Sequence, residues 1–245
     1  MNKKIKKTET KSEFIKTLLI ALLLAGLVRS FLFEPFHIPS SSMKQNLLIG
    51  DYLFVAKYSY GYSRYSFPFG FDLFEGRFWE KNKPQRGDIA VFRLPSDPNI
   101  NYIKRIIGLP GDQIQMREGK VFINDTGVKK ISDGIFSEDD AEIKIEIRQF
   151  LETLPEGKIV KTLDQDNTPQ DNTGIYEVPA NHYFMMGDNR DNSQDSRFLE
   201  FVGYVPEENL VGRATMIFIS CSKPIWQFWN WPNSIRFNRM FHQVS

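Results

Sequence analysis

Hydrophobic residues occur along the chain in one long run followed by several short ones. The long run covers residues 14–33 and is interrupted only by Lys16-Thr17 and Arg29-Ser30 near its ends. A helix of this length spans about 30 Å, the thickness of the hydrocarbon core of a bilayer. The later runs are four to six residues long and are separated by turn residues. The pattern predicts one N-terminal transmembrane helix followed by an all-β, mainly antiparallel domain.

Five of the short apolar runs have the length of buried strands. One of them, 102–107, contains two cations, Lys104 and Arg105, which lie on opposite faces of a strand of period two. Because buried cations are costly, we expect one of them to be exposed and the other to have a purpose. A lysine that simply points to solvent beside Tyr102 is the ordinary alternative. The predicted strands are residues 52–55, 89–92, 102–107, 183–186 and 214–219.

Residues 115–177 differ in composition from the rest of the chain. They contain 14 acidic and 8 basic residues and no tryptophan, with hairpin signals at 121–128 and an alternation of Ile143, Ile145 and Ile147. This composition predicts a polar, β-rich insertion that carries no chemistry. The predicted division of the chain is therefore a basic tail at 1–13, an anchor at 14–33, a catalytic β-domain at 34–114 and 178–245, and the insertion at 115–177.

Lysines are concentrated before the apolar run. Residues 1–16 contain six lysines and two glutamates, and the next lysine after this region is Lys44. This asymmetry places the N-terminus in the cytoplasm and the remaining chain on the far side of the membrane. A cleavable signal peptide is the competing interpretation. Its cleavage site would be poor, because Leu23 precedes Ala25 by two positions and a charged residue interrupts 28–30. We therefore expect a retained anchor.

The overall composition excludes several classes of protein. A net charge of +1 gives no basic surface for a nucleic acid, and a single cysteine, Cys221, excludes an intrachain disulfide and a thiolate zinc cluster. The three histidines are too far apart in the sequence to suggest metal ligands, so neither a metal nor a cofactor is expected. They are His37, His182 and His242.

Aromatic residues gather in two parts of the chain. Residues 51–80 contain 12 of them in 30 positions, many in the loop 58–74. Beside a membrane anchor, such a loop is typical of a surface at the lipid interface, but it could equally form a second aromatic core. The second group lies near the C-terminus and consists of Trp226, Phe228, Trp229 and Trp231.

Candidate chemistry begins with three serines, Ser40, Ser41 and Ser42, that follow the anchor and are flanked by large apolar residues. A serine nucleophile needs a base. No histidine stands in a triad-like setting and no Gly-x-Ser-x-Gly motif occurs, so a lysine is the candidate, because burial can lower its pKa from about 10.4 to near neutrality. An apolar strand such as 102–107 suits such a lysine.

The polar loop 187–197 fails as a calcium site, because Ser196 occupies the glycine position and Val202 the position of the bidentate glutamate. Its Asx turns and Asp-Arg pairs suit a loop that holds fixed geometry.

Several segments resemble the sequence boxes of bacterial type I signal peptidases, in the order of that family. The resemblance covers most of the chain from Arg29 to Ala214. The segments are 39–43 (PSSSM), 48–51 (LIGD), 86–88 (RGD), 102–105 (YIKR), 108–112 (GLPGD), 187–193 (GDNRDNS) and 195–197 (DSR).

The resemblance implies a membrane-anchored serine endopeptidase of the bacterial inner membrane that removes signal peptides from exported preproteins and uses a Ser-Lys dyad. Ser42 would be the nucleophile and Lys104 the general base. Ser40, with the backbone N–H of Ser42, would form the oxyanion hole, and Ser193 would orient the lysine. Asp195 and Arg197 would support the loop. The residues that would line pockets for small side chains are Phe36, Ile38, Met43, Leu47, Tyr102 and Ile103.

The chain departs from the family pattern at two positions close to the nucleophile. Ser41 stands where glycine is frequent, and Gln45 stands where proline is usual. Both changes affect backbone freedom and leave the reacting groups in place. Two other functions compete with the peptidase. One is a self-cleaving repressor with the same dyad, which the anchor disfavours. The other is an inactive anchored β-domain that binds signal sequences or membrane partners.

Overall fold

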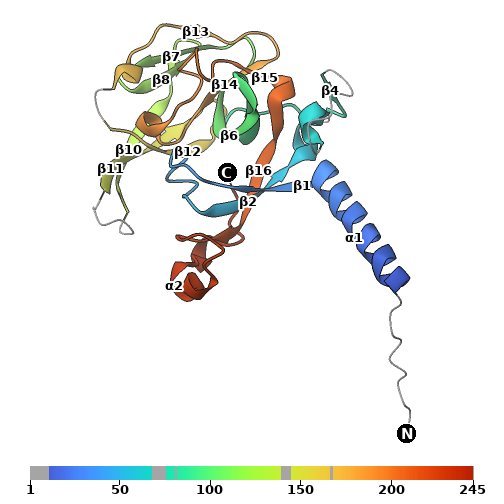
Figure 1. The fold of residues 1–245 in the computed structure, drawn as a ribbon. Helices are drawn as coiled ribbons and strands as arrows, with labels where there is room; N and C mark the ends of the chain where they lie inside the picture. Colours follow the sequence, from blue (N-terminus) through green and yellow to red (C-terminus); the bar gives the residue numbers. More distant parts are fainter. Residues whose placement is uncertain (1–10, 68–75, 81, 139–144, 166–167, 245) are drawn as a thin grey trace.

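The computed structural model describes residues 11–67, 76–80, 82–138, 145–165 and 168–244. Most of the predicted basic tail, part of the aromatic loop and the predicted alternation at Ile143 lie outside these residues. A single long helix, α1 (Lys11–Phe31), extends away from a body of β-sheet (Figure 1). The predicted class, mainly antiparallel β with one N-terminal apolar helix, is confirmed.

Helix α1 is long and apolar enough to cross a membrane, and nearly all of its side chains are exposed. Its sequence contains no proline and its only glycine is Gly26, so nothing interrupts the hydrogen-bond ladder. The helix ends at Phe31, two residues before the predicted end of the apolar run, because Phe33 already pairs with Ala56 in a strand. Only Leu32 separates the helix from that strand.

The main sheet has seven strands in the order β1-β2-β16-β5-β6-β14-β15, and its pairings are antiparallel. Strand β1 pairs with β2 alone, and β6 pairs with β14 only from Arg105 to Gly108. In the described structure, one edge of β1 therefore has no strand beside it. The first part of β6 pairs with β5 on one side and has no strand on the other. The strands are β1 (Phe33–His37), β2 (Asp51–Ala56), β5 (Ile89–Leu94), β6 (Asp97–Gly108), β14 (His182–Met186), β15 (Val205–Pro206) and β16 (Leu210–Ser220).

Between β6 and β14 the chain forms two smaller sheets, which contain the predicted insertion. One has the order β10-β11-β12 and the other β13-β7-β8-β9. The predicted boundaries, residues 115 and 177, fall within β7 and β13. The strands are β7 (Gln113–Arg117), β8 (Lys120–Ile123), β9 (Thr126–Gly127), β10 (Lys129–Glu138), β11 (Ile145–Thr153), β12 (Ile159–Leu163) and β13 (Tyr176–Glu177).

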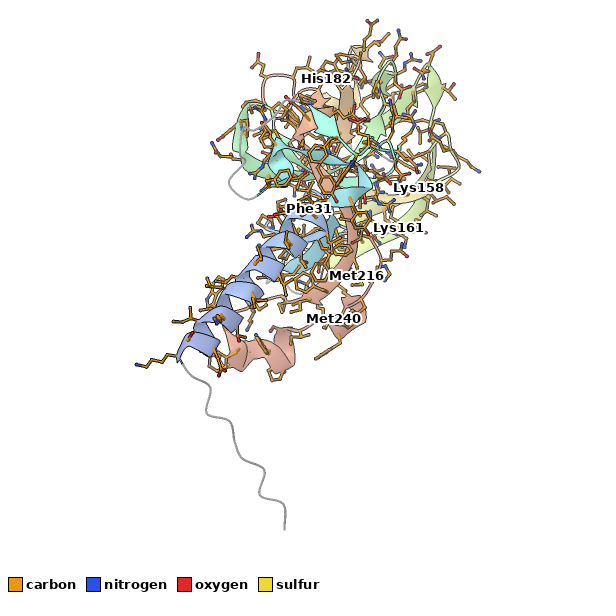
Figure 2. All side chains as sticks on the ribbon, turned by 90° about the vertical axis from the view of Figure 1, so that its right-hand side faces the viewer. Phe31, Lys158, Lys161, His182, Met216 and Met240 are labelled. Carbon is orange, nitrogen blue, oxygen red and sulfur yellow. The ribbon has the colours of Figure 1, made fainter. Side chains whose placement is uncertain are left out.

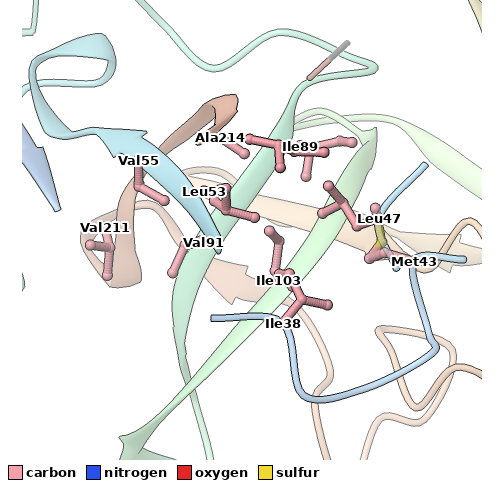
Figure 3. Close-up of a cluster of buried hydrophobic side chains, with 11 residues drawn as sticks. Ile38, Met43, Leu47, Leu53, Val55, Ile89, Val91, Ile103, Val211 and Ala214 are labelled. Carbon is pink, nitrogen blue, oxygen red and sulfur yellow. The ribbon is translucent and has the colours of Figure 1, made fainter. Parts of the chain in front are cut away.

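The hydrophobic core consists of three clusters of buried side chains. One cluster places Ile38, Met43 and Leu47, from the segment after β1, against Leu53 and Ile103 of the main sheet (Figure 3). A second cluster joins insertion residues to β6 and β14. The insertion thus shares its core with the main sheet, and burial of these side chains holds the two together.

The junction between α1 and the body is tightly packed. The Tyr62 hydroxyl donates to the Phe31 carbonyl over 2.7 Å, and the rings of Phe31 and Tyr62 contact edge to face. Figure 2 shows Phe31 where the helix meets the body. Tyr62 belongs to the two-stranded sheet of β3 (Tyr62–Ser63) and β4 (Arg77–Phe78).

The chain ends in a short helix, α2 (Trp231–Ser234), and an aromatic segment that extends from the same side of the body as α1 (Figures 1 and 2). Arg239 returns to the main sheet and pairs with the buried Asp51 at 2.6 Å. The large side chains of this segment are mostly exposed. They are Trp226, Phe228, Trp229, Trp231, Phe237 and Phe241.

Candidate active site

The three serines lie on a tight turn that follows β1. The Lys44 N–H donates to the Ser41 carbonyl over 3.0 Å, and the Leu47 N–H donates to the Met43 carbonyl over 2.8 Å. Met43 and Leu47 are fully buried in the core below the turn. These apolar side chains fix the turn from beneath, so the hydroxyl of Ser42 is held on an ordered support.

Lys104 of β6 places its Nζ 2.7 Å from the Oγ of Ser42, and its other hydrogen bond goes to the Ile103 carbonyl at 3.1 Å. Its side chain is only 4% exposed, and no carboxylate of the described residues lies within ion-pair distance of it. Burial lowers the pKa of Lys104 from 10.5 to about 8, although Asp195 and Asp188 act in the opposite direction. A lysine in this state can be neutral and accept a proton near physiological pH.

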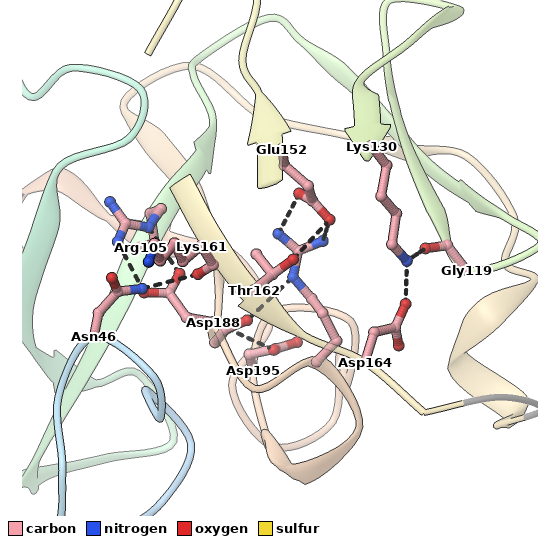
Figure 4. Close-up of polar contacts among 12 residues, drawn as sticks. Asn46, Arg105, Gly119, Lys130, Glu152, Lys161, Thr162, Asp164, Asp188 and Asp195 are labelled. Atoms are coloured by element: carbon pink, nitrogen blue, oxygen red, sulfur yellow. Dashed lines mark hydrogen bonds and ion pairs between the residues drawn. The ribbon is translucent and has the colours of Figure 1, made fainter. Parts of the chain in front are cut away.

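The neighbouring residue, Arg105, is also fully buried, so the expectation that one of the two cations is exposed is wrong. Arg105 forms a two-pronged ion pair with Asp188, with N–O distances of 2.7 and 2.8 Å (Figure 4). A third bond goes to the Gly87 carbonyl at 2.6 Å. Asp188 thus balances the charge of Arg105, and the Gly87 carbonyl accepts a further hydrogen bond from it. These contacts allow both faces of β6 to be buried.

The loop 187–197 packs directly against the serine turn. A Cβ atom on Gly187 would lie 2.2 Å from the Oγ of Ser193 and 2.6 Å from the carbonyl oxygen of Ser42, so only glycine fits there. The Ser193 hydroxyl donates to Asp195 over 2.7 Å, and Asp195 also accepts from the Gly187 N–H and from Arg197. In the described structure Ser193 makes no hydrogen bond to Lys104.

Asp195 and Arg197 form the predicted supporting pair at 2.9 Å, and both are buried. Burial, the largest single effect, would raise the pKa of Asp195, but the Arg197 guanidinium together with hydrogen bonds from Gly187 and Ser193 holds that pKa below its usual value. The carboxylate therefore stays charged and contributes a negative potential near Lys104.

Two asparagines of the same loop hold the serine turn. The Asn189 N–H donates to the Ser42 carbonyl over 3.0 Å and its side chain to the Ser41 carbonyl over 3.1 Å. The Asn192 side chain donates to the Ser41 hydroxyl over 2.6 Å. The sequence predicted a loop that holds fixed geometry, but not these partners, which lie about 150 positions apart and leave no local pattern.

Two donors face the region where an oxyanion would form. The Ser40 hydroxyl lies 3.3 Å from the Oγ of Ser42. The backbone N–H of Ser42 donates no hydrogen bond to any residue that the structure describes. A tetrahedral intermediate on Ser42 could accept hydrogen bonds from both.

The two departures from the family pattern have different consequences. Ser41 is not among the residues of positive φ, so it lacks the strain that a glycine position would impose. Gln45 has a φ of +58°, which a proline ring, locked near −65°, cannot adopt. The turn after the nucleophile therefore has a backbone conformation at Gln45 that no proline there could share.

A cleft of about 510 Å³ opens at the Ser42-Lys104 pair. Of the six predicted pocket residues, four line it and two, Met43 and Leu47, lie beneath it in the core, because the apolar face of the turn points inward. Asn192 and Gln194 form part of the opposite wall, and the Tyr102 hydroxyl donates to Gln194 over 3.2 Å. The four lining residues from the prediction are Phe36, Ile38, Tyr102 and Ile103.

Three carboxylates outside the cleft could in principle hold a metal ion. Ligand atoms of Asp164, Asp171 and Asp191 lie within 4.8 Å of one another. Lys130 already contacts Asp164, and the Thr168 hydroxyl contacts the other two. These donors give the cluster a structural role between the insertion and the loop 187–197.

Comparison with known proteins identifies the family of the chain. The family model for signal peptidase, peptidase S26, matches residues 11–219. Signal peptidase I of Rickettsia typhi is 39% identical, with 99% of this chain and 97% of that protein covered, and signal peptidase I of Rickettsia akari is 40% identical, with 90% and 88% covered. A crystal structure of a signal peptidase I from Enterococcus faecalis V583 matches with a TM-score of 0.31 and 26% identity, over 54% of this chain and 97% of that one.

The match of the family model extends over most of the chain, and the relatives are similar over nearly their whole length. The region matched by the family model, residues 11–219, includes α1, the serine turn, Lys104 and the loop 187–197. The chain belongs to the signal peptidase family, peptidase S26.

Proposed function

We propose that this chain is a membrane-anchored serine endopeptidase that removes signal peptides from exported preproteins, with Ser42 as nucleophile and Lys104 as general base. One observation carries the proposal. The amine of Lys104 is buried, has no carboxylate partner among the described residues and lies 2.7 Å from the hydroxyl of Ser42. A buried lysine whose pKa falls to about 8 supplies the base that a serine hydroxyl requires.

The reaction is an acyl transfer in two stages. In the first stage, neutral Lys104 takes the hydroxyl proton of Ser42 while the Oγ of Ser42 bonds to the scissile carbonyl carbon. The resulting oxyanion accepts hydrogen bonds from the Ser40 hydroxyl and the Ser42 N–H. The C–N bond then breaks, and Lys104 passes its proton to the leaving amine. In the second stage, Lys104 takes a proton from water, the water oxygen attacks the ester, and Ser42 regains its proton as the acid product leaves.

The supporting residues act through the loop 187–197. Asp195 and Arg197 keep the loop in place, and the charge of Asp195 raises the pKa of Lys104 against the larger effect of burial. Ser193 and the Ser42 carbonyl both lie close against Gly187. We propose that its hydroxyl, which donates to Asp195 here, orients the lysine through that carboxylate.

The substrate binds as an extended strand in the cleft. Strand β1 and the first part of β6 offer unpaired backbone edges, to which a peptide can add by main-chain hydrogen bonds. Phe36, Ile38 and Ile103 narrow the cleft beside Ser42 and favour small side chains. Backbone pairing then supplies most of the affinity, since small side chains bury little area.

The anchor sets the location of the reaction. Helix α1 has the length and apolarity of a membrane span, and six lysines in the first 16 residues favour a cytoplasmic N-terminus. The catalytic domain then lies outside the inner membrane of the bacterial cell. The exposed aromatic side chains of the C-terminal segment, on the same side of the body as α1, suit contact with lipid (Figure 2).

Cleavage of a purified preprotein in detergent or lipid tests the proposal. The wild-type protein should cut after a small-x-small sequence, and Ser42→Ala and Lys104→Ala should each lose about 10³-fold in kcat or more. Full activity of Lys104→Ala would overturn the assignment of the base. A wild-type protein that binds the signal peptide but never cuts it would instead support the binding-module alternative.

A further inference from the structure

A strained residue lies three positions after the nucleophile, and the insertion holds it. Gln45 has a φ of +58°, a left-handed conformation that is strained for a non-glycine residue. Its side chain crosses to β11 of the insertion, where its Nε2 donates to the Oε1 of Gln149 over 2.8 Å. This hydrogen bond joins the nucleophile turn to a strand 104 residues later in the sequence.

The orientation of the Gln149 amide is determined by a carboxylate. Its Nε2 donates to Asp133, which can only accept, so its Oε1 is left facing Gln45. Asp133 reaches this position through a bulge in β10. Ser132 pairs with Phe150 and Ile135 with Arg148, so Asp133 and Gly134 together lie opposite Gln149. Such bulges redirect side chains, here toward the active site.

The next residue of the turn makes a second connection to the insertion. The Asn46 side chain donates to the Lys161 carbonyl of β12 over 2.9 Å and to Asp188 over 2.7 Å (Figure 4). Asp188 is the partner of the buried Arg105, next to Lys104. The turn that carries Ser42 is thus held between the insertion strands and the strand of the proposed base.

We propose that Gln149 is a positioning residue of the peptidase, which acts through Gln45 to hold Ser42 at its short distance from Lys104. The inference rests on the proposed function, since it assumes that Ser42 and Lys104 react. The insertion then supports catalysis through a relay from Asp133 to Gln149 and Gln45. None of these three side chains lines the cleft, so the relay contributes to the alignment of Ser42 more than to substrate contact.

The expected effect is a loss of turnover. Without its hydrogen bond to Gln149, Gln45 has no contact to offset the strain of its positive φ, and the turn relaxes. A small misplacement of a reacting group can cost up to about 10²-fold in rate. We expect Gln149→Ala to lower kcat about tenfold and to leave KM within about twofold of the wild-type value.

A matched control is available within the insertion. Gln115 is a partly buried glutamine whose amide donates to the Thr173 carbonyl, away from the serine turn. Gln115→Ala removes a comparable side chain and should leave kcat unchanged. Gln45→Gly supplies the second comparison, because glycine adopts a φ of +58° without strain and no longer needs the hydrogen bond. In that background, Gln149→Ala should cost less than about twofold.

The cleavage assay described above measures kcat and KM for each variant, with melting temperatures measured in parallel. Equal kcat values for Gln149→Ala and Gln115→Ala overturn the proposal, as does a tenfold loss that persists in the Gln45→Gly background. If Gln149→Ala melts below the assay temperature, Asp133→Ala at an exposed position decides, because it removes the acceptor that fixes the Gln149 amide, and an unchanged kcat there rejects the relay. Failure of the dyad itself is seen separately, as activity that survives Ser42→Ala in the otherwise wild-type chain.

Discussion

Two lysines are buried in different regions of this protein, one at the cleft and one at the junction with the membrane helix. Lys57 is 2% exposed and its Nζ lies 2.6 Å from Glu34, which also pairs with Arg29 at the end of α1. Lys104 is similarly buried, but its amine hydrogen-bonds a hydroxyl and a carbonyl and has no carboxylate partner among the described residues. Burial lowers the pKa of both, and at Lys57 the carboxylate of Glu34 opposes that effect.

The comparison shows what distinguishes a structural lysine from the lysine that we propose as the base. A carboxylate partner favours the charged form of a lysine, and at Lys57 the pair helps to join the membrane helix to the body. A lysine denied such a partner can give up its proton, and it becomes a base. The difference lies in one neighbouring side chain, and each of the following experiments changes one side of this contrast.

The largest effect on stability is expected at the junction. Glu34→Gln removes the negative charge and leaves Lys57 buried without a counter-ion, which should lower the unfolding free energy by about 3 kcal/mol or more. Thermal unfolding in detergent measures the change. The double variant Glu34→Gln with Lys57→Met should recover most of the loss, because both charges are then absent. A double variant as unstable as Glu34→Gln alone would show that the pair does not account for the loss.

At the cleft, removal of the buried lysine is expected to raise the stability of the protein. The pKa of Lys104 falls from 10.5 in the unfolded chain to about 8, which corresponds to about 3 kcal/mol of lost stability at 1.36 kcal/mol per pH unit. The unfolded chain binds the proton more tightly, so stability rises with pH between these two values and the cost is fully present below pH 8. Lys104→Met should therefore be inactive but more stable.

Urea unfolding at two pH values measures this effect. The gain of Lys104→Met over the wild-type protein should be greatest at pH 7 and should vanish above about pH 10.5. Lys57→Met is the control and should show no such gain at pH 7, because it leaves Glu34 without its buried partner. A gain of equal size for both variants would contradict the contrast between the two lysines.

The smallest effect is a slope in the pH profile of activity. Below the pKa of Lys104, about 8, the neutral fraction falls tenfold for each pH unit, so kcat/KM should fall by about the same factor between pH 7 and 6 and level off above 8. The profile of Lys57→Met should have the same midpoint. A flat profile between pH 6 and 8 would be inconsistent with Lys104 as the base.

Local pattern predicted the elements better than it predicted their contacts. The apolar run at 14–33 and the short β-like runs lie in α1 and in strands of the main sheet, because hydrophobic period and length are properties of neighbouring residues. Lys104 could be singled out because a cation is unusual in an apolar strand. Ser42 needed the family resemblance, since a serine-rich turn has no distinctive pattern of its own.

Contacts between distant residues could not be anticipated in this way. Arg105 finds Asp188 at a separation of 83 positions, and Gln45 finds Gln149 at 104. Neither pairing leaves a periodic signal, because it depends on how the sheets assemble. Met43 was predicted to line the cleft and lies in the core, since an apolar residue in a turn does not reveal which face it presents.

The single residue between α1 and β1 has a mechanical consequence. Leu32 is the only residue between them, and Tyr62 and Glu34 hold the junction, so we expect the helix and the strand that borders the cleft to move together as a rigid unit. A bilayer thinner or thicker than the apolar length of α1 changes the tilt of such a helix. That tilt rotates the cleft relative to an emerging substrate, so the rate of cleavage in vesicles should vary with the acyl-chain length of the lipid.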